Sequence, residues 1–292
     1  MAGASITQVR QTYELPGNAV FPESIGVDAE AGDAYVGSLG DGTLYRLRRD
    51  RLTAEIFSPG GADGRGSVAG VKIDPSGRLW AAGGYDGTLW IYDLKRRELL
   101  GRLELAEPPT CVNDIAFGPG GRGFVTDSFV PYLFRVDADS LAVERWVDLK
   151  AEGVPWPDGL NLNGIVLTGD GRHLISCQTN TGRLWRISLD SGRVEEVEVQ
   201  GGPFEHADGL ARDGSLLYVA INAGQQVAVL EVHDTGATAA LRTILRSDAF
   251  AFPTAVARRG DELLVVNAQL DKMNSAPELP FTVVAIEPAA TA

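Results

Sequence analysis

The chain has 292 residues and a formal net charge of −13 at pH 7, from 26 basic and 39 acidic side chains. A protein this acidic, without a basic stripe, is not suited to a phosphate backbone, and no apolar run approaches the roughly 20 residues that span a bilayer. We therefore expect neither a nucleic-acid partner nor a membrane span. Glycine, at 35 residues, is well above its usual share of about 7%, which predicts many tight turns.

The first ten residues and the two cysteines indicate where the protein resides. Residues 1–10 lack a basic segment followed by an apolar stretch, so no secretory signal is predicted. Cys111 and Cys177 stand alone, outside any CxxC pair, and we expect both to be reduced thiols. These features predict a cytoplasmic protein, and 22 Arg against 4 Lys indicates a GC-rich, bacterial genome.

Four segments combine a turn with a leucine–aromatic pair and alternating apolar residues. This pattern is typical of β-strands. No stretch places apolar residues at helical spacing between caps, so we expect few helices. The four segments are 41–47, 86–92, 131–136 and 181–187.

A second recurring segment, a short apolar strand, sets the length of the repeat. Its first residue recurs six times, at intervals of 46, 44, 50, 45 and 46 residues. Six four-stranded modules at a period of about 40–50 residues predict an all-β fold, a six-bladed β-propeller forming a single domain over residues 1–292. The six positions are Glu23, Ala69, Asn113, Asn163, Asp208 and Thr254.

The last module has room for only three strands, near 254–258, 262–267 and 281–287. We expect the N-terminal segment 7–15 to supply the fourth strand, which would close the ring and remove an exposed sheet edge. A solenoid of stacked repeats is the alternative, but it would need distinct capping repeats, and none is visible.

In a propeller the first strand of each blade lines the central channel, so the six positions would form a ring around one axis. Four of them carry carboxylate or amide oxygens, which suit a divalent cation of the Ca²⁺ kind, with Mn²⁺ or Zn²⁺ as alternatives. The three histidines fall at unrelated phases, away from any zinc-type cluster. The competing interpretation is turn chemistry, since Asn-Gly and Asp-Gly are common turn dipeptides, but it does not explain Glu23 after Pro22 at the same phase.

The ring and its flanking residues resemble the SMP-30/gluconolactonase/luciferin-regenerating-enzyme family of six-bladed propellers, to which paraoxonases and diisopropylfluorophosphatase are related. The resemblance covers essentially the whole chain and is strongest at 21–24, 112–115, 162–165 and 207–210. It implies that Glu23, Asn163 and Asp208 are direct metal ligands. It also implies that Asn113 is a further ligand or holds a metal-bound water or the substrate.

The activity implied by the resemblance is metal-dependent hydrolysis of a lactone or related ester. The cation would polarise the carbonyl, and Asp208 or a metal-bound water would act as base or nucleophile, with Asn113 beside it. Sugar-lactone-hydrolysing members typically carry an arginine two residues before the Asn of the third blade, where this chain has Cys111. Without that guanidinium we expect a less polar substrate. Cys111 itself is either a small buried thiol or a nucleophile near the metal.

Other residues near the ring are candidate contacts to a small-molecule substrate. Residues 154–161 lengthen one interval to 50 and could cover the channel mouth. Ordinary turn chemistry explains several of the candidates equally well. The candidates are Cys111, Asp127, Trp156, Asn180 and His206.

Two other classes of function stay open, for a protein expected to be a monomer or small homo-oligomer. The metal site could serve a non-hydrolytic biosynthetic step such as a cyclisation or isomerisation, because fold and metal do not fix the chemistry. Alternatively, the propeller is a non-catalytic module that binds a protein or a small ligand. The WD-like segment 90–93 favours this last class but recurs poorly among the modules.

Overall fold

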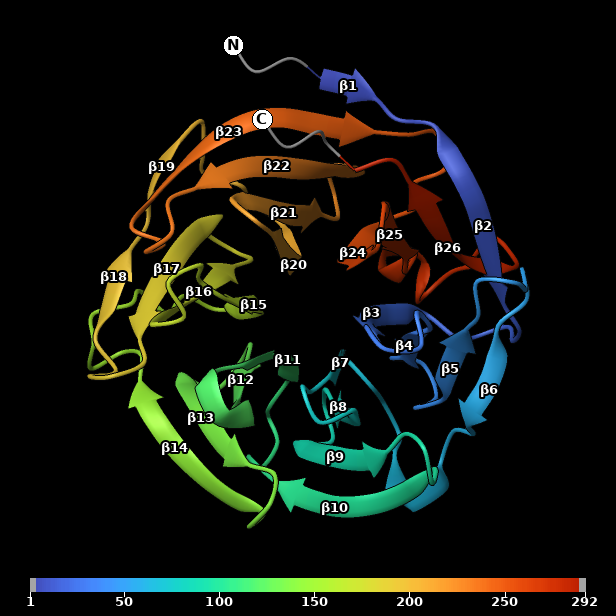
Figure 1. Ribbon diagram of the computed structural model, residues 1–292, viewed down its shortest axis with the longest axis horizontal. Helices are drawn as coiled ribbons and strands as arrows, with labels where there is room; N and C mark the ends of the chain where they lie inside the picture. Colours follow the sequence, from blue (N-terminus) through green and yellow to red (C-terminus); the bar gives the residue numbers. More distant parts are fainter. Residues whose placement is uncertain (1–3, 289–292) are drawn as a thin grey trace.

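The computed structural model describes residues 4–288, which form six β-sheets arranged in a closed ring (Figure 1). The predicted six-bladed propeller is confirmed, and closure of the ring excludes a solenoid. Helical structure in this part of the chain consists of three short 3₁₀ turns, η1 (Ala62–Gly64), η2 (Pro119–Gly121) and η3 (Leu270–Lys272). No helix within residues 4–288 has the length and apolar character needed to cross a membrane.

The first four blades each take four consecutive antiparallel strands, with the first strand innermost (Figure 1). Blade 1 contains β3 (Pro22–Val27), β4 (Ala34–Ser38), β5 (Leu44–Leu47) and β6 (Glu55–Ser58). Blade 2 contains β7 (Gly70–Ile73), β8 (Arg78–Ala82), β9 (Thr88–Asp93) and β10 (Glu98–Glu104). Blade 3 contains β11 (Val112–Phe117), β12 (Gly123–Asp127), β13 (Tyr132–Asp137) and β14 (Ala142–Asp148). Blade 4 contains β15 (Leu162–Leu167), β16 (His173–Gln178), β17 (Arg183–Ser188) and β18 (Val194–Glu196).

The last two blades incorporate additional segments. Blade 5 contains β20 (Ala207–Asp213), β21 (Leu216–Ile221), β22 (Gln226–Val232) and β23 (Thr238–Arg246). Two short strands, β1 (Ala4–Ile6) and β19 (Glu198–Gln200), pair in parallel with β23. Blade 6 contains β24 (Pro253–Arg259), β25 (Glu262–Asn267), β26 (Phe281–Ile286) and β2 (Val9–Leu15).

Closure of the ring by the N-terminal segment is confirmed. Strand β2 pairs antiparallel with β26, from Val9 opposite Ile286 to Leu15 opposite Phe281. Strand β1, which precedes β2, lies instead on the outer edge of blade 5 (Figure 1). The N-terminal segment therefore joins the last two blades.

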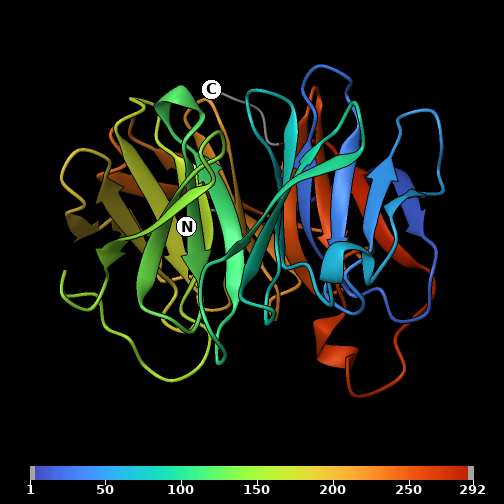
Figure 2. The same cartoon turned by 90° about the horizontal axis from the view of Figure 1, so that it is seen from below.

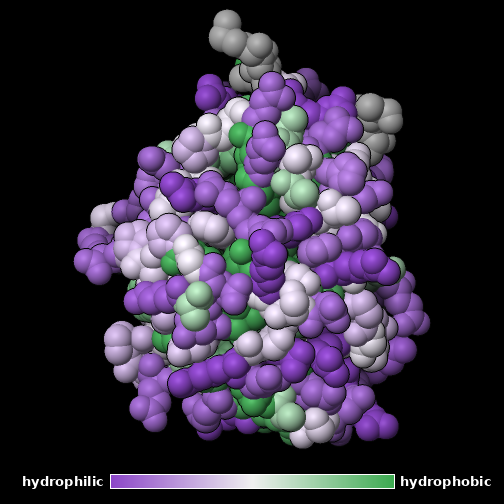
Figure 3. Space-filling view, turned by 90° about the vertical axis from the view of Figure 1, so that its left-hand side faces the viewer, coloured by the Kyte–Doolittle hydropathy of each residue, from purple (hydrophilic) through white to green (hydrophobic). Residues whose placement is uncertain are grey.

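The apolar core lies between neighbouring blades rather than at the axis. Between blades 6 and 1, for example, Tyr13, Leu15 and Phe281 pack in one cluster with Tyr45 and Phe21. The side view in Figure 3 shows a mainly hydrophilic outer surface, with apolar residues only in small separate spots. The alternation of apolar and polar residues along the strands thus places the apolar set between the sheets.

The Asn-Gly and Asp-Gly dipeptides of the ring lie inside strands β15 and β20, so the turn interpretation is wrong for them. A Cβ on Gly164 would lie 2.4 Å from the carbonyl oxygen of Asp208, and one on Gly209 would lie 2.7 Å from that of Thr254. Both distances are shorter than a non-bonded contact. Glycine is therefore required because each innermost strand lies directly against the next one.

The closing strand makes a testable contribution to stability through Tyr13. This side chain is fully buried, and its ring centroid lies 4.9 Å from the guanidinium carbon of Arg259 in blade 6, which its hydroxyl also contacts. We expect Tyr13→Ala to lower the free energy of unfolding by about 3–5 kcal/mol, because it leaves a cavity between the blades. Tyr13→Phe keeps the ring and should cost about 1 kcal/mol. Urea denaturation measures both, and a Tyr13→Ala protein as stable as wild type would contradict this role of β2.

Candidate metal centre

The ring positions lie at the heads of the innermost strands, which surround the axis in Figure 1. In five blades the pairing of the first strand with the second is irregular at this point, a bulge that turns a side chain out of the regular alternation. The four predicted ligands are all buried. They are Glu23, Asn113, Asn163 and Asp208, with exposed fractions of 6, 4, 3 and 3%.

Hydroxyl groups from the ends of second strands orient the two asparagine amides. Thr179 Oγ1 donates to the Ala207 carbonyl oxygen at 2.7 Å, and Ser128 Oγ donates to that of Leu162 at 2.7 Å. Each hydroxyl has a single proton, so it accepts from an amide nitrogen: Asn163 Nδ2 donates to Thr179 at 3.2 Å, and Asn113 Nδ2 donates to Ser128 at 3.0 Å. The amide oxygens are therefore the atoms left available to a ligand.

Asp208 is held through one carboxylate oxygen only. Asn222 Nδ2 donates to Asp208 Oδ2 at 3.0 Å, and Asn222 is itself oriented because its Oδ1 accepts from the Ala223 amide at 2.6 Å. Among the hydrogen bonds within residues 4–288, none reaches the buried Oδ1 of Asp208. A buried carboxylate oxygen without a partner is costly, and it marks a place where a positive charge would be stabilised.

The two carboxylates of the ring lie close enough to destabilise each other's charge. Burial raises the pKa of Glu23 well above its ordinary value, and the charges of Asp208 and Asp114 raise it further, against the opposing charge of Lys72. Burial also raises the pKa of Asp208 to about 7, although hydrogen bonds from Asn222 and Asn163 counteract the rise. The raised pKa values show that the positive charge of Lys72 does not compensate the two buried carboxylates in full.

These observations fit a hard divalent cation. The donor set is two carboxylates and two amide oxygens, the ligand type that Ca²⁺ prefers. Within the described part of the chain, no group of three or more His, Cys, Asp or Glu residues is placed to hold a metal ion, so a site here depends on the two asparagines. The assignment of Glu23, Asn113, Asn163 and Asp208 as ligands stays a prediction that this geometry supports.

Two charged residues beside the ring were missed by sequence reasoning. Asp114 follows Asn113 and is 4% exposed. Its Oδ1 lies 2.6 Å from Lys72 Nζ, and its Oδ2 accepts from the Ile165 amide at 3.1 Å. The available signal was a break in the repeat, because the residue after the ring position is Gly, Ser or Ala in the other five blades and Asp only here.

The predicted substrate contacts have different environments. Cys111 is 4% exposed, and burial together with the nearby Glu23 charge raises the pKa of its thiol. Asp127 is fully buried, and its carboxylate accepts from the amides of residues 111, 129 and 130 and from the hydroxyl of Thr110, so its oxygens already serve the local loop. Asn180 donates to the Asp158 carbonyl oxygen at 3.3 Å, and His206 is exposed with a φ of 64°.

An aromatic wall, consisting of Tyr85 and Phe129, stands beside Cys111. The rings of Tyr85 and Phe129 are 6.3 Å apart between centroids, and Trp156 Nε1 donates to the Phe129 carbonyl oxygen at 3.2 Å. Gly84 pairs with Val112 as a β-bridge, which fixes Tyr85 near Cys111. Burial raises the pKa of Tyr85, and the nearby Cys111 and Glu23 add to the rise. Trp156, from the segment predicted to cover the channel mouth, is thus tied to the backbone of Phe129, and its side chain packs against the apolar core between blades 3 and 4.

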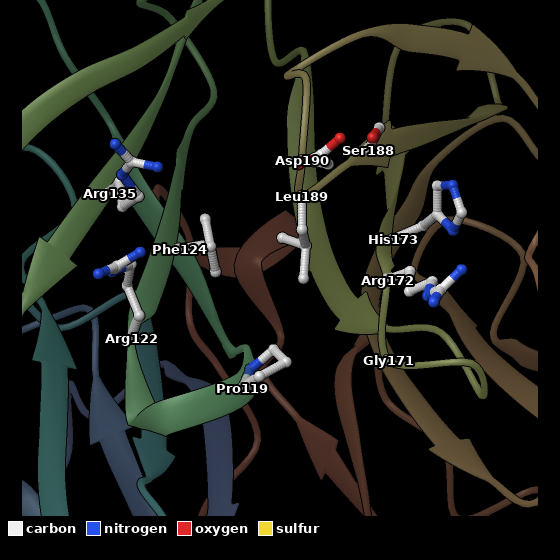
Figure 4. A pocket seen from close by; sticks show the side chains of 10 residues that line it. All are labelled: Pro119, Arg122, Phe124, Arg135, Gly171, Arg172, His173, Ser188, Leu189 and Asp190. Atoms are coloured by element: carbon white, nitrogen blue, oxygen red, sulfur yellow. The ribbon is translucent and has the colours of Figure 1, made fainter.

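A separate cleft of about 660 Å³ lies between blades 3 and 4. Figure 4 shows Phe124 and Leu189 facing each other across it, with Arg122 and Arg135 along one side and Arg172 pointing away. The turns that line it follow the far ends of β11 and β15, so it lies at the opposite end of the blades from the ring. In Figure 2, η2, beside this cleft, is at the top, whereas η3, which follows β25, is at the bottom. The cleft is not part of the candidate metal centre.

Comparisons with solved structures agree with the fold. Regucalcin of Agrobacterium tumefaciens, a calcium-binding protein, is 17% identical with a TM-score of 0.69, over 98% of this chain and 97% of that one. The Malassezia sympodialis allergen Mala s 1 is 14% identical with a TM-score of 0.70, over 96% and 97%. Virginiamycin B lyase of Staphylococcus aureus is 16% identical with a TM-score of 0.66, over 89% and 82%. At these identities the likeness shows the fold alone.

No protein-family model matches the chain, and no curated protein matches it in sequence. The family resemblance expected from the ring residues therefore stays a prediction, and what the comparisons show is the propeller fold that this chain shares with regucalcin and virginiamycin B lyase.

The raised pKa of Asp208 predicts a pH dependence of the metal-free protein. An unfolded aspartate has a pKa of about 3.9, so between about pH 4 and pH 7 the folded state keeps a proton that the unfolded state has released. This contribution to stability is present below pH 4 and is lost as the pH rises through 7. In EDTA, Asp208→Asn should therefore become more stable relative to wild type as the pH rises from 4.5 to 7.5. Urea denaturation across this range measures the difference, and a difference independent of pH would contradict the assignment.

Proposed function

We propose that this chain is a divalent-cation-dependent hydrolase of lactones or related esters. The observation that carries the proposal is the buried Asp208 carboxylate, with one oxygen unpartnered, at the same channel as Glu23 and two oriented amides. The fold shared with a calcium-binding regucalcin supports it. Glu23, Asn163 and Asp208 would hold the cation, and Asn113 would contribute its amide oxygen to the cation, to a water or to the substrate.

A bound Ca²⁺ would supply a Lewis acid for a carbonyl oxygen. The protein's own part is to hold the oxygens in place. Asn222 fixes the Asp208 carboxylate through Oδ2, which leaves Oδ1 to accept a proton from an attacking water or to bind the cation. Thr254 donates to the backbone carbonyl of Glu23 at 2.7 Å and so fixes that residue across the junction of blades 6 and 1.

The neighbourhood of the ring favours a substrate with an apolar or aromatic group. Cys111 is small and uncharged at neutral pH, because burial raises the pKa of its thiol. It therefore offers neither a guanidinium for sugar hydroxyls nor a thiolate nucleophile. Tyr85 and Phe129 of the aromatic wall provide an apolar surface close to it. We accordingly expect alkyl- or aryl-substituted lactones and aryl esters to be better substrates than sugar lactones.

Metal dependence is tested by thermal unfolding. In excess EDTA the melting temperature should be lowest, and Ca²⁺ at about 100 times its dissociation constant should add about 2.7 kcal/mol, or about 5–10 °C for a chain of this size. Asp208→Asn should abolish the shift. Glu231→Gln, which removes a half-exposed carboxylate paired with Arg242 on the surface, should retain it. If no divalent cation changes the melting temperature of wild type, the metal centre is refuted and the non-catalytic propeller is favoured.

Catalysis is tested with a panel of lactones and aryl esters assayed with Ca²⁺. Glu23→Gln keeps the shape of the side chain but removes its charge from the ring, so kcat/KM should fall by at least about 100-fold. Glu231→Gln is again the matched control, with activity like that of wild type. Full activity in Glu23→Gln would contradict the proposed mechanism even if the cation binds.

A non-hydrolytic step at the same site is the second candidate. The observation in its favour is the likeness of fold to virginiamycin B lyase, together with the absence of an arginine at position 111. Reaction in H₂¹⁸O separates the two, because hydrolysis incorporates ¹⁸O into the product whereas an elimination or isomerisation does not.

A further inference from the structure

Lys72 places a positive charge beside the candidate metal centre. It lies in β7, the innermost strand of blade 2, in an otherwise apolar run, and its side chain is 21% exposed. Its ammonium contacts Asp114 Oδ1 of blade 3 at 2.6 Å. A Cβ on Gly26 of blade 1 would lie 2.9 Å from Lys72 Cα, so the backbone of Lys72 packs directly against β3, the strand that carries Glu23.

The charges around the ring can be counted by residue. Glu23, Asp208 and Asp114 act on one another, and Lys72 acts on Glu23 with the opposite sign. With a cation bound the three carboxylates are ionised, so they contribute −3 and Lys72 contributes +1. The resulting charge of −2 matches a divalent cation.

Lys72 does not itself occupy the place of the cation. Its ammonium pairs with Asp114, whose second oxygen is taken by the Ile165 amide. Asp208 Oδ1, by contrast, has no hydrogen-bond partner within the described residues. Lys72 thus neutralises the charge of Asp114 in blade 3. The charges of Glu23 and Asp208 remain to be neutralised by a bound cation.

We propose that Lys72 is a specificity-determining residue that sets the charge of the metal centre and thereby matches it to a divalent rather than a trivalent cation. The inference rests on the proposed function, since it concerns the same site. Asp114 of blade 3 contacts Lys72 of blade 2 and the Ile165 amide of blade 4, so its carboxylate links three blades. Lys72 offsets the negative charge that Asp114 adds to the channel.

The test is calorimetric titration of the purified full chain with Ca²⁺ and with Tb³⁺. Removing a like charge in Lys72→Met should tighten Ca²⁺ binding on the order of tenfold, for a separation of about 6 Å at an effective dielectric constant of about 80. Coulomb energy scales with the charge of the ion, so Tb³⁺ binding should tighten on the order of thirtyfold. Lys72→Arg keeps the charge and should bind both ions as wild type does.

A double variant separates charge from structure. Lys72→Met with Asp114→Asn removes one charge of each sign, so the ring returns to −2 and both binding constants should return to within about threefold of wild type. If Lys72 only holds β11 in place, both Lys72→Met and the double variant bind the cations more weakly than wild type, and the proposal is overturned. Unchanged binding in Lys72→Met overturns it as well, while leaving the metal centre intact. Failure of wild type and all variants to bind either ion overturns the metal centre and this inference with it.

Discussion

The structure depends on one electrostatic constraint, which is that two carboxylates are buried at the axis of a propeller. Glu23 and Asp208 come from blades 1 and 5, and burial raises the pKa of both. Their charged forms are stable there only if positive charge reaches them. Lys72 supplies part of it but is already paired with Asp114. A divalent cation would neutralise the negative charge that Lys72 leaves uncompensated. The positive charge of that cation is also what would polarise a substrate carbonyl in the proposed reaction.

Hydrogen bonds and backbone contacts between neighbouring blades fix the positions of the oxygen atoms around the channel. Hydroxyls of Ser128 and Thr179 donate to carbonyl oxygens of the next blade and accept from the ring asparagines, so a single side chain both joins two blades and orients a candidate ligand. Gly164 allows β15 to lie against the backbone of Asp208. The spacing of the ring is therefore set by backbone contacts, and a change in blade packing would be transmitted to the candidate ligands.

The ring could be predicted from the sequence because six positions, separated by five intervals of 44 to 50 residues, fall at the same point of each repeat, and four of them carry carboxylate or amide oxygens. Turn chemistry does not explain Glu23 at this point. Lys72 and Asp114 could not be predicted, because their pairing depends on how two blades approach, and a repeat period carries no such information. The parallel pairing of β1 with β23 could not be predicted either. It involves only three residues of β1, paired from Ala4 opposite Ile244 to Ile6 opposite Arg246, and so short a segment gives no strand pattern in the sequence. For Asp127 the sequence predicted a substrate contact, but in the structure its carboxylate accepts hydrogen bonds from backbone amides of the surrounding loops.

The most direct test is crystallographic, with the protein soaked in Mn²⁺ or Tb³⁺ and measured for anomalous scattering. A single strong peak is expected on the axis, at about 2.3–2.6 Å from carboxylate oxygens of Glu23 and Asp208 and from the amide oxygen of Asn163. The hydrogen bonds of Ser128, Thr179 and Asn222 should be unchanged, because they already orient these groups. Density without a peak at these oxygens, at saturating metal, would contradict the central claim that this channel is a metal centre.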